Sequence, residues 1–290
     1  MKFKLNGLEK FIIRHKHLAK WFFLVIYFLL ILISINFDLP TFAVNLFLIL
    51  SVSICFVINT YPNFKAQKLL KIHNEDLDMY SFLEGTNLMI EALNPKDIAN
   101  ISNFCNNRIT ALYNIGEYEK AEMETRLFWQ SFDLKKVPTA TLASTHISMA
   151  MLALSNLDEK AYNDQMRIVY QYRQNSQNNA LVRNTLDYAI ESIHIFADAK
   201  KAEKNSVRYD FEARVLAHLN TNPINNKPRK KAPAKLEFFS AYCKLFVYYK
   251  NIENSQKATY YAQQLLNMGN EQLAAYHKAK EYLENANRSN

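Results

Sequence analysis

The sequence predicts an all-α protein whose N-terminal part is a hairpin of two membrane-spanning helices. Two uncharged apolar runs, 21–37 and 41–59, lie near the N-terminus and are separated by three residues. Beyond them, apolar residues recur at helical spacing nearly throughout. Only four glycines and seven prolines occur in 290 residues, too few for the turns of an all-β fold or for glycine-rich phosphate-binding loops.

The two apolar runs have lengths that suit a bilayer. The first has 17 residues, which extend about 25 Å as a helix and just reach across the hydrocarbon core. The second has 19 residues, and its polar side chains are limited to Asn45, a few hydroxyl groups and the terminal Asn59. Residues 38–40 form the turn, where Pro40 suits the start of a helix because its missing N–H is not needed there. We therefore expect two antiparallel membrane spans.

Basic residues flank this hairpin on both sides. Residues 1–20 hold six Lys or Arg, the three lysines Lys65, Lys68 and Lys71 follow the second run, and the turn carries only Asp38. Because Lys and Arg near span ends are retained in the cytoplasm, we expect both termini to be cytoplasmic. We expect a bacterial cell membrane, with a eukaryotic internal membrane as the alternative. A cleaved signal peptide is not favoured, because the second run follows the first at once.

The chain divides further on either side of the hairpin. In residues 1–20, apolar side chains at three- and four-residue spacing alternate with basic ones, which predicts a helix on the membrane surface; charges without defined structure are the alternative. Residues 60–94 predict connecting helices, after a helix boundary at 61–63 that contains Pro62. Residues 94–97, Asn-Pro-Lys-Asp, then carry a start signal for a helix that reaches about Ile115, with Asn94 as cap, Pro95 in the first position and Asp97 in the first turn.

Four short segments that end in Lys-Ala predict turns between helices. They are Gly116–Ala121, Asn156–Ala161, Ala197–Ala202 and Glu253–Ala258. The first, Gly-Glu-Tyr-Glu-Lys-Ala, resembles the inter-helix turn of the tetratricopeptide repeat. This resemblance implies pairs of antiparallel helices that approach closely at each alanine: Ala121, Ala161, Ala202 and Ala258. Their spacings of 40, 41 and 56 residues exceed the family's repeat of about 34.

Three further columns around these alanines are apolar. At twelve residues before, nine before and seven after, they hold Ile109, Met149, Ile190 and Phe246, then Leu112, Leu152, Ile193 and Tyr249, then Phe128, Ile168, Tyr209 and Leu265. In the tetratricopeptide family the first of these columns usually holds small residues. Only the first of the four copies keeps the family's glycine and aromatic residue, here Gly116 and Tyr118. We therefore expect residues 95–290 to form a degenerate tetratricopeptide-like domain, an α-solenoid of antiparallel helix pairs, with a related helical-hairpin array as the alternative.

Two sets of residues are candidates for binding. Helical-repeat proteins commonly bind peptides in a groove lined by the first helix of each pair, which points to Asn107, Arg108, Tyr113 and Asn114; packing of the tyrosines between helices is the alternative. The basic loop 220–233 carries Lys227, Arg229, Lys230 and Lys231 among three prolines. These side chains are candidates for contacting lipid headgroups or an acidic partner, and a solvated linker is the alternative. Nucleic acid is not expected, because the loop has no stacking aromatics.

No pattern in the sequence predicts catalysis. The seven histidines lack the helical pairing of metal sites, the three cysteines have no metal or disulfide spacing, and no nucleophile elbow occurs. We expect no enzyme activity, metal or cofactor. The leading hypothesis is a membrane-tethered cytoplasmic helical-repeat scaffold that binds a protein or peptide partner. The alternative is an accessory or regulatory subunit of a membrane complex, such as an exporter, that packs through its hairpin.

Overall fold

The computed structural model describes residues 3–37, 41–204, 208 and 210–288, and it is all-helical. Helix accounts for 80% of the structure, and no strand occurs among the described residues. The α-helices are α1 (Gly7–His15), α2 (Ala19–Phe37), α3 (Thr41–Lys71), α4 (Met79–Ala92), α5 (Ile98–Ile115), α6 (Tyr118–Ser131), α7 (Thr139–Ser155), α8 (Glu159–Asn175), α9 (Ala180–Lys201), α10 (Phe211–Leu219), α11 (Lys235–Asn251), α12 (Ser255–Met268) and α13 (Ala274–Arg288). Short helical turns are η1 (Lys16–Leu18), η2 (Ile72–Asp76) and η3 (Leu134–Lys136). The predicted all-α class is confirmed.

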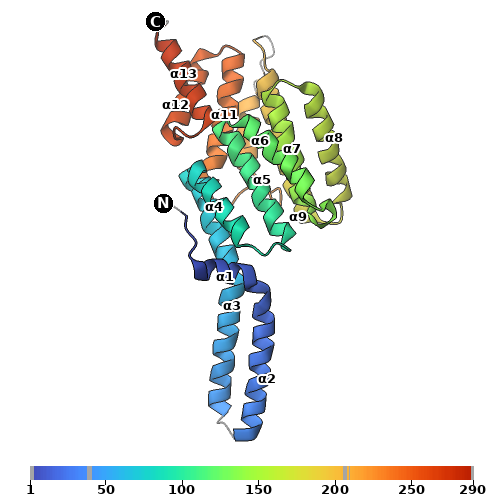
Figure 1. The fold of residues 1–290 in the computed structure, drawn as a ribbon. Helices are drawn as coiled ribbons and strands as arrows, with labels where there is room; N and C mark the ends of the chain where they lie inside the picture. The colour runs from blue at the N-terminus through green and yellow to red at the C-terminus, as the bar shows by residue number, and fades with distance from the viewer. Residues whose placement is uncertain (1–2, 38–40, 205–207, 209, 289–290) are drawn as a thin grey trace.

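Helices α2 and α3 pack against each other and project from the other helices as a long stalk (Figure 1). In the part of the chain that is described, one helix, Asn45–Asp76, is long and apolar enough to cross a membrane. Helix α2 contributes a shorter apolar stretch, Leu24–Ser34. Large apolar side chains along both helices are exposed, such as Trp21 at 67% and Phe42 at 77%. An apolar surface of this extent requires a lipid or protein cover. The expected turn at 38–40 lies outside the described residues.

Helix α3 passes through Pro62 without a break, so the helix boundary expected at 61–63 is wrong. Proline removes one backbone donor from a helix interior and normally ends or kinks it. In α3 the carbonyl that loses its donor is that of Ile58, yet the helix continues to Lys71. Asn59 Nδ2 donates to the Cys55 carbonyl at 2.9 Å and Thr60 Oγ1 donates to the Phe56 carbonyl at 2.8 Å, and these bonds add side-chain support to the turn that precedes Pro62. A single helix therefore joins the stalk to the head, which we define as α4–α13.

The N-terminal segment crosses the junction between stalk and head (Figure 1). Glu9 of α1 accepts a hydrogen bond from the Tyr61 hydroxyl at 2.5 Å and pairs with Lys65 Nζ at 2.5 Å, both on α3. The hydrogen bonds from Lys65 and Tyr61 lower the pKa of Glu9 to about 2. Phe3 is buried against Gly85 of α4, where an added Cβ would lie 3.0 Å from Phe3 Cγ. The start of the chain is therefore clamped to both α3 and α4.

Helix α1 keeps an exposed apolar face beside the stalk. Leu8 is 69% exposed and Phe11 is 60% exposed, whereas Ile13 is fully buried. The first turn is capped by Asn6, whose side chain accepts from the Glu9 amide at 2.9 Å. Residues 7–18 thus have defined helical structure, and the amphipathic spacing expected for the segment 1–20 coincides with a helix over residues 7–15.

Three of the four predicted turns join antiparallel helices in the head, and they share one geometry. The turns at 116–121, 156–161 and 253–258 connect α5 to α6, α7 to α8 and α11 to α12. Each has a residue in the left-handed region, followed by an amide that donates to the carbonyl five residues earlier. The residues are Gly116, Leu157 and Glu253, and the bonds are Glu117 to Leu112 at 3.0 Å, Asp158 to Ala153 at 2.9 Å and Asn254 to Tyr249 at 2.9 Å.

The predicted turn at 197–202 is wrong, because these residues form the last turn of α9 and its C-cap. Ala197 and Ala199 are buried in the packed core, and no glycine or capping side chain interrupts the helix before Lys201. Ala202 is the C-cap residue and is half-buried. Sequence similarity to the other Lys-Ala segments therefore does not indicate the same structure here.

The shared turn geometry also shifts the register of the second repeat by one residue. Ala121 and Ala258 each stand four residues after the N-cap residue of their helix, Glu117 and Asn254, and both are fully buried. In the second repeat the cap is Asp158, so the equivalent position is Tyr162, and Ala161 is only half-buried. Two of the apolar columns shift with it, because Ala150 and Val169 are buried whereas Met149 and Ile168 are half-exposed. In the middle column both Leu152 and its neighbour Ala153 are buried. Tyr209, expected in one column, lies outside the described residues.

The first helices of these pairs stand in a row, and the row closes on itself. Helix α5 contacts α7, α7 contacts α9, α9 contacts α11, and α13 returns to α5. The closure is held by two side chains before α13: Asn270 Nδ2 donates to the Leu77 carbonyl at 2.9 Å, and Gln272 Nε2 donates to Asp78 Oδ1 at 3.1 Å. The head is therefore a helical, repeat-like array whose last helices meet its first.

The register shift predicts different responses to one substitution at two alanines. Ala121→Leu forces a larger side chain into a filled contact and should lower the free energy of unfolding by about 1–3 kcal/mol. Ala161→Leu adds the same atoms at a half-exposed position and should change it by less than about 0.5 kcal/mol. Chemical unfolding of the full chain in detergent measures both. Equal losses would contradict the register derived from the turns.

Candidate functional site

A groove of about 710 Å³ lies in the head between the helices of the closed row. Its walls come from α5, α7, α9, α11 and α13, with Tyr118 of α6 at one edge. Most of the lining is apolar and includes Phe196, Phe239 and Phe246. Hydroxyl and amide groups, among them Ser155 of α7, are distributed between these apolar side chains. A space of this size with a few polar groups is typical of binding sites.

Four lysines line the groove, against a single acidic side chain, Glu281. These groove lysines are Lys200 on α9, Lys244 and Lys250 on α11, and Lys278 on α13. No carboxylate among the described residues forms an ion pair with any of them, although Lys200 and Lys278 lie over the Phe196 and Tyr118 rings. The groove therefore carries an excess of positive charge.

Some lysines elsewhere on the head have carboxylate partners. Lys257 Nζ lies 2.5 Å from a Glu212 carboxylate oxygen, and Lys204 Nζ lies 2.5 Å from Glu253. Exposed lysines such as Lys135 and Lys160 form no ion pair among the described residues, and water can surround them. The groove differs from these surface positions because its Lys244 is buried as well as unpaired.

Burial makes two groove lysines poor bases. Lys244 is 8% exposed, and its only hydrogen-bond acceptor among the described residues is Ser192 Oγ at 2.7 Å. Loss of water from around its ammonium lowers the pKa of Lys244 to about 8. Burial also lowers the pKa of Lys200, and repulsion from Lys278 lowers it further. The structure thus holds positive charges without a carboxylate partner in a partly dry site, and burial of an unpaired charge is unfavourable.

The four candidate partner-binding residues fall into two separate places. Tyr113 and Asn114 line the groove, and the Tyr113 hydroxyl lies 3.0 Å from Ser155 Oγ. Arg108 lies away from it and joins three helices, because its guanidinium bonds to Asn87 of α4 and pairs with Glu124 of α6 at 2.6 Å. Asn107 is half-buried and is not part of the groove wall.

The basic loop 220–233 follows α10, and its four basic side chains also lie in two different environments. Arg229 is 15% exposed and holds Glu237 through two hydrogen bonds, of 2.9 and 2.5 Å. Its Nε also donates to the Thr221 carbonyl at 2.9 Å, so this side chain fastens the loop to α11. The other three basic side chains of the loop, Lys227, Lys230 and Lys231, are exposed. Only these three remain free to contact lipid or a partner.

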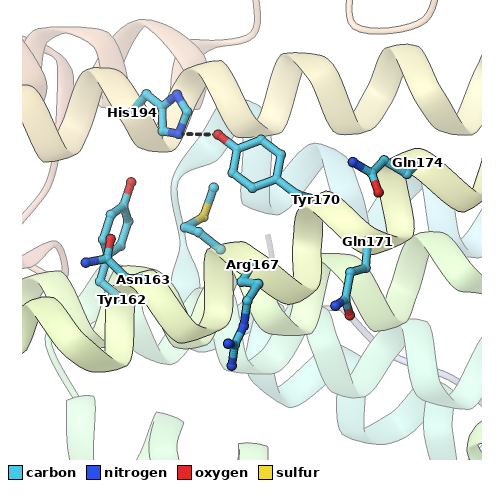
Figure 2. A pocket seen from close by; sticks show the side chains of 8 residues that line it. Tyr162, Asn163, Arg167, Tyr170, Gln171, Gln174 and His194 are labelled. Carbon is cyan, nitrogen blue, oxygen red and sulfur yellow. Dashed lines mark hydrogen bonds between the residues drawn. The ribbon is translucent and has the colours of Figure 1, made fainter.

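A second hollow, of about 510 Å³, lies on the outer side of α8 and is shallow (Figure 2). Figure 2 shows Tyr170 of α8 directed at His194 of α9, and the Tyr170 hydroxyl lies 2.9 Å from His194 Nε2. Arg167 points away from these two side chains and pairs with Asp164 at 3.3 Å. The described residues that line the hollow thus include no buried charge and no cluster of metal-binding side chains, and nothing in them indicates a ligand.

The described residues contain no group of three or more His, Cys, Asp or Glu side chains that is placed to hold a metal ion. No protein-family model, curated protein or solved structure matches this chain. The candidate site therefore rests on its own geometry: an enclosed apolar groove with unpaired lysines.

Sequence patterns did not single out the groove lysines. One signal was present, because Lys244 is the only charged residue between Glu237 and Lys250, in a stretch rich in aromatic and aliphatic side chains. A single charge inside an apolar helix face marks either a partner elsewhere in the fold or a site. That Lys200 and Lys278 share its surroundings follows only from the closure of the row of helices.

The unpaired ammonium of Lys244 predicts a stabilising substitution. Lys244→Met keeps the length of the side chain and removes a buried charge, so it should raise the free energy of unfolding at pH 7 by about 1–3 kcal/mol. Lys257→Met, which breaks the pair with Glu212, should lower it. Chemical unfolding of both variants measures these changes, and a loss of stability in Lys244→Met would contradict the account.

The advantage of Lys244→Met also depends on pH. The folded chain releases the Lys244 proton near pH 8, whereas the unfolded chain keeps it until about pH 10.4. The charge penalty is therefore complete below pH 8, and wild-type stability recovers between pH 8 and about 10.4. The difference in free energy of unfolding between Lys244→Met and wild type should therefore decrease from pH 8 to about 10.4, as measured by chemical unfolding at a series of pH values.

Proposed function

We propose that the chain is a membrane-tethered helical-repeat scaffold whose groove binds a segment of a protein partner. The observation that carries this proposal is the groove itself, which is enclosed by the first helices of successive pairs and has unpaired charges in its walls. Three turns with one geometry support a degenerate tetratricopeptide-like solenoid as the architecture. The partner segment would contact side chains from five helices at once.

The tether in this proposal is the α2–α3 stalk inserted as two spans. Its exposed apolar side chains and the apolar helix Asn45–Asp76 support insertion. Lysines and arginines flank the stalk on the side of the head, which favours cytoplasmic termini and a cytoplasmic head. We place the protein in a bacterial cell membrane. A tethered groove raises the effective concentration of partner at that membrane.

A second candidate function is that of a subunit that packs through the stalk into a larger membrane complex. Asn45 of α3 favours it, because its side chain is exposed within an apolar helix and an amide at membrane depth gains from a hydrogen bond across helices. Ser53 is exposed as well, whereas the Ser51 hydroxyl already donates to the Phe47 carbonyl of its own helix at 2.8 Å. The face that carries Asn45 is the one that a neighbouring span would cover.

Photocrosslinking in intact membranes distinguishes the two functions. A photoreactive phenylalanine analogue replaces Tyr113 in the groove, Asn45 in the stalk, or Tyr170 on the outer side of α8 as a control. The scaffold predicts a specific protein adduct from position 113 that is absent from position 170. An adduct from position 45 alone would contradict the scaffold and favour the subunit.

A further inference from the structure

Charge and burial in the groove indicate what kind of segment it takes. Cys243 lines the groove together with Lys200, Lys244 and Lys278. Burial raises the pKa of the Cys243 thiol although the positive charges of the three lysines oppose this, so the thiol stays neutral. Lysines from three helices, of which Lys244 is buried, Lys200 half-buried and Lys278 exposed, therefore line one groove that has no thiolate to neutralise them.

These ammonium groups have donors left over. A lysine ammonium has three N–H donors, and Lys244 uses one of them on Ser192. Glu191, whose charge acts on Lys244, accepts from Arg214 Nε at 2.7 Å, and Glu281 of the groove lining forms no ion pair with Lys244. Two donors of a side chain that is more than nine-tenths buried thus remain for a ligand that enters the groove.

We propose that the groove binds an acidic peptide segment, with carboxylates among Lys200, Lys244 and Lys278 and apolar side chains against the phenylalanine walls. The proposal rests on the proposed scaffold function and names the chemistry of its partner. Carboxylates of the peptide would neutralise lysines to which the described residues of the protein supply no carboxylate. Charge-assisted hydrogen bonds in a partly dry site are stronger than those at an exposed surface.

The distribution of polar groups favours a peptide over a fatty acid or another single-headed lipid. Such a lipid needs one polar end and a continuous apolar channel. In this groove the polar groups come from several walls: Asn114 of α5, Ser155 of α7, Ser192 of α9, and Ser240 and Asn251 of α11. Polar groups alternating with aromatic ones suit a chain that has a backbone amide at every residue.

Selection of random peptides displayed on phage tests the proposal on the full chain in detergent. We expect the selected peptides to be enriched in Asp and Glu relative to the starting library. A synthetic copy of a selected peptide should bind the triple variant Lys200→Met, Lys244→Met, Lys278→Met on the order of a hundredfold more weakly or worse, since each lost charge contact near the ligand reduces affinity about tenfold.

A matched control variant carries the same three changes on the basic loop: Lys227→Met, Lys230→Met and Lys231→Met. It alters net charge equally but leaves the groove intact, so it should bind the peptide as wild type does. Lys278→Met alone serves as a second groove variant, because its exposed side chain can be changed without disturbing the fold. Unfolding midpoints of all variants verify that the head is folded.

The outcomes separate this inference from the scaffold function. Selected peptides without acidic enrichment, or with binding that the loop triple variant abolishes, overturn the inference and leave the scaffold in place. A library that yields no peptide above background overturns both. If sodium oleate displaces the selected peptides and its own binding is lost in the groove triple variant while no peptide shows acidic enrichment, the occupant is an anionic lipid and the proposal is wrong.

Discussion

The rest of the structure depends on the continuity of α3, which carries the chain from the stalk into the head through a proline. Proline in a helix interior leaves a carbonyl without its usual donor, and at a solvent-exposed site water and a kink would follow. Side-chain donors from Asn59 and Thr60 keep the preceding turn in place. Downstream, Lys65 and Leu69 on the same helix hold α1 and the buried Phe3, so the head is fixed to the stalk on two sides.

The corner after α3 sets where the array of helices closes. Leu77 adopts a left-handed conformation and is fully buried, and its carbonyl is the acceptor for Asn270 from the far end of the chain. At the opposite contact, Gly116 leaves room for Ala274, which lies 3.1 Å from where a Cβ would stand. These two contacts bring α13 back to α5 and turn a row of helix pairs into a walled groove. The charge in the groove is a consequence of this closure.

The features predicted correctly from the sequence are those that neighbouring residues determine. The turns at Gly116, Leu157 and Glu253 are closed by local amides. The expected start of a helix at Asn94 and Pro95 is wrong, because Asp97 caps α5 and the helix begins at Ile98. Local rules also failed where α3 continues through Pro62 and where buried packing carries α9 past its Lys-Ala segment. The predicted register was wrong by one residue in the second repeat, because the N-cap Asp158 lies three residues before Ala161 and not four.

The candidate site was less predictable than the fold, because it is assembled from distant parts of the chain. Tyr113 and Asn114 could be anticipated from their place near the end of a first helix, whereas Arg108 on the same helix is used to hold α4 and α6. Lys200, Lys244 and Lys278 line one groove only because the array closes. Their spacing along the chain does not indicate this shared groove.

The central claim, that one continuous helix runs from the stalk into the head through Pro62, can be measured as a distance. Spin labels at Val52→Cys and Lys71→Cys, with the native Cys55, Cys105 and Cys243 replaced by alanine, report the separation across Pro62 in lipid nanodiscs. An unbroken helix predicts a narrow distribution at a backbone separation of about 28 Å. A broad distribution, or a clearly shorter distance, would show that the helix ends at Pro62 and that the head is not fixed to the stalk.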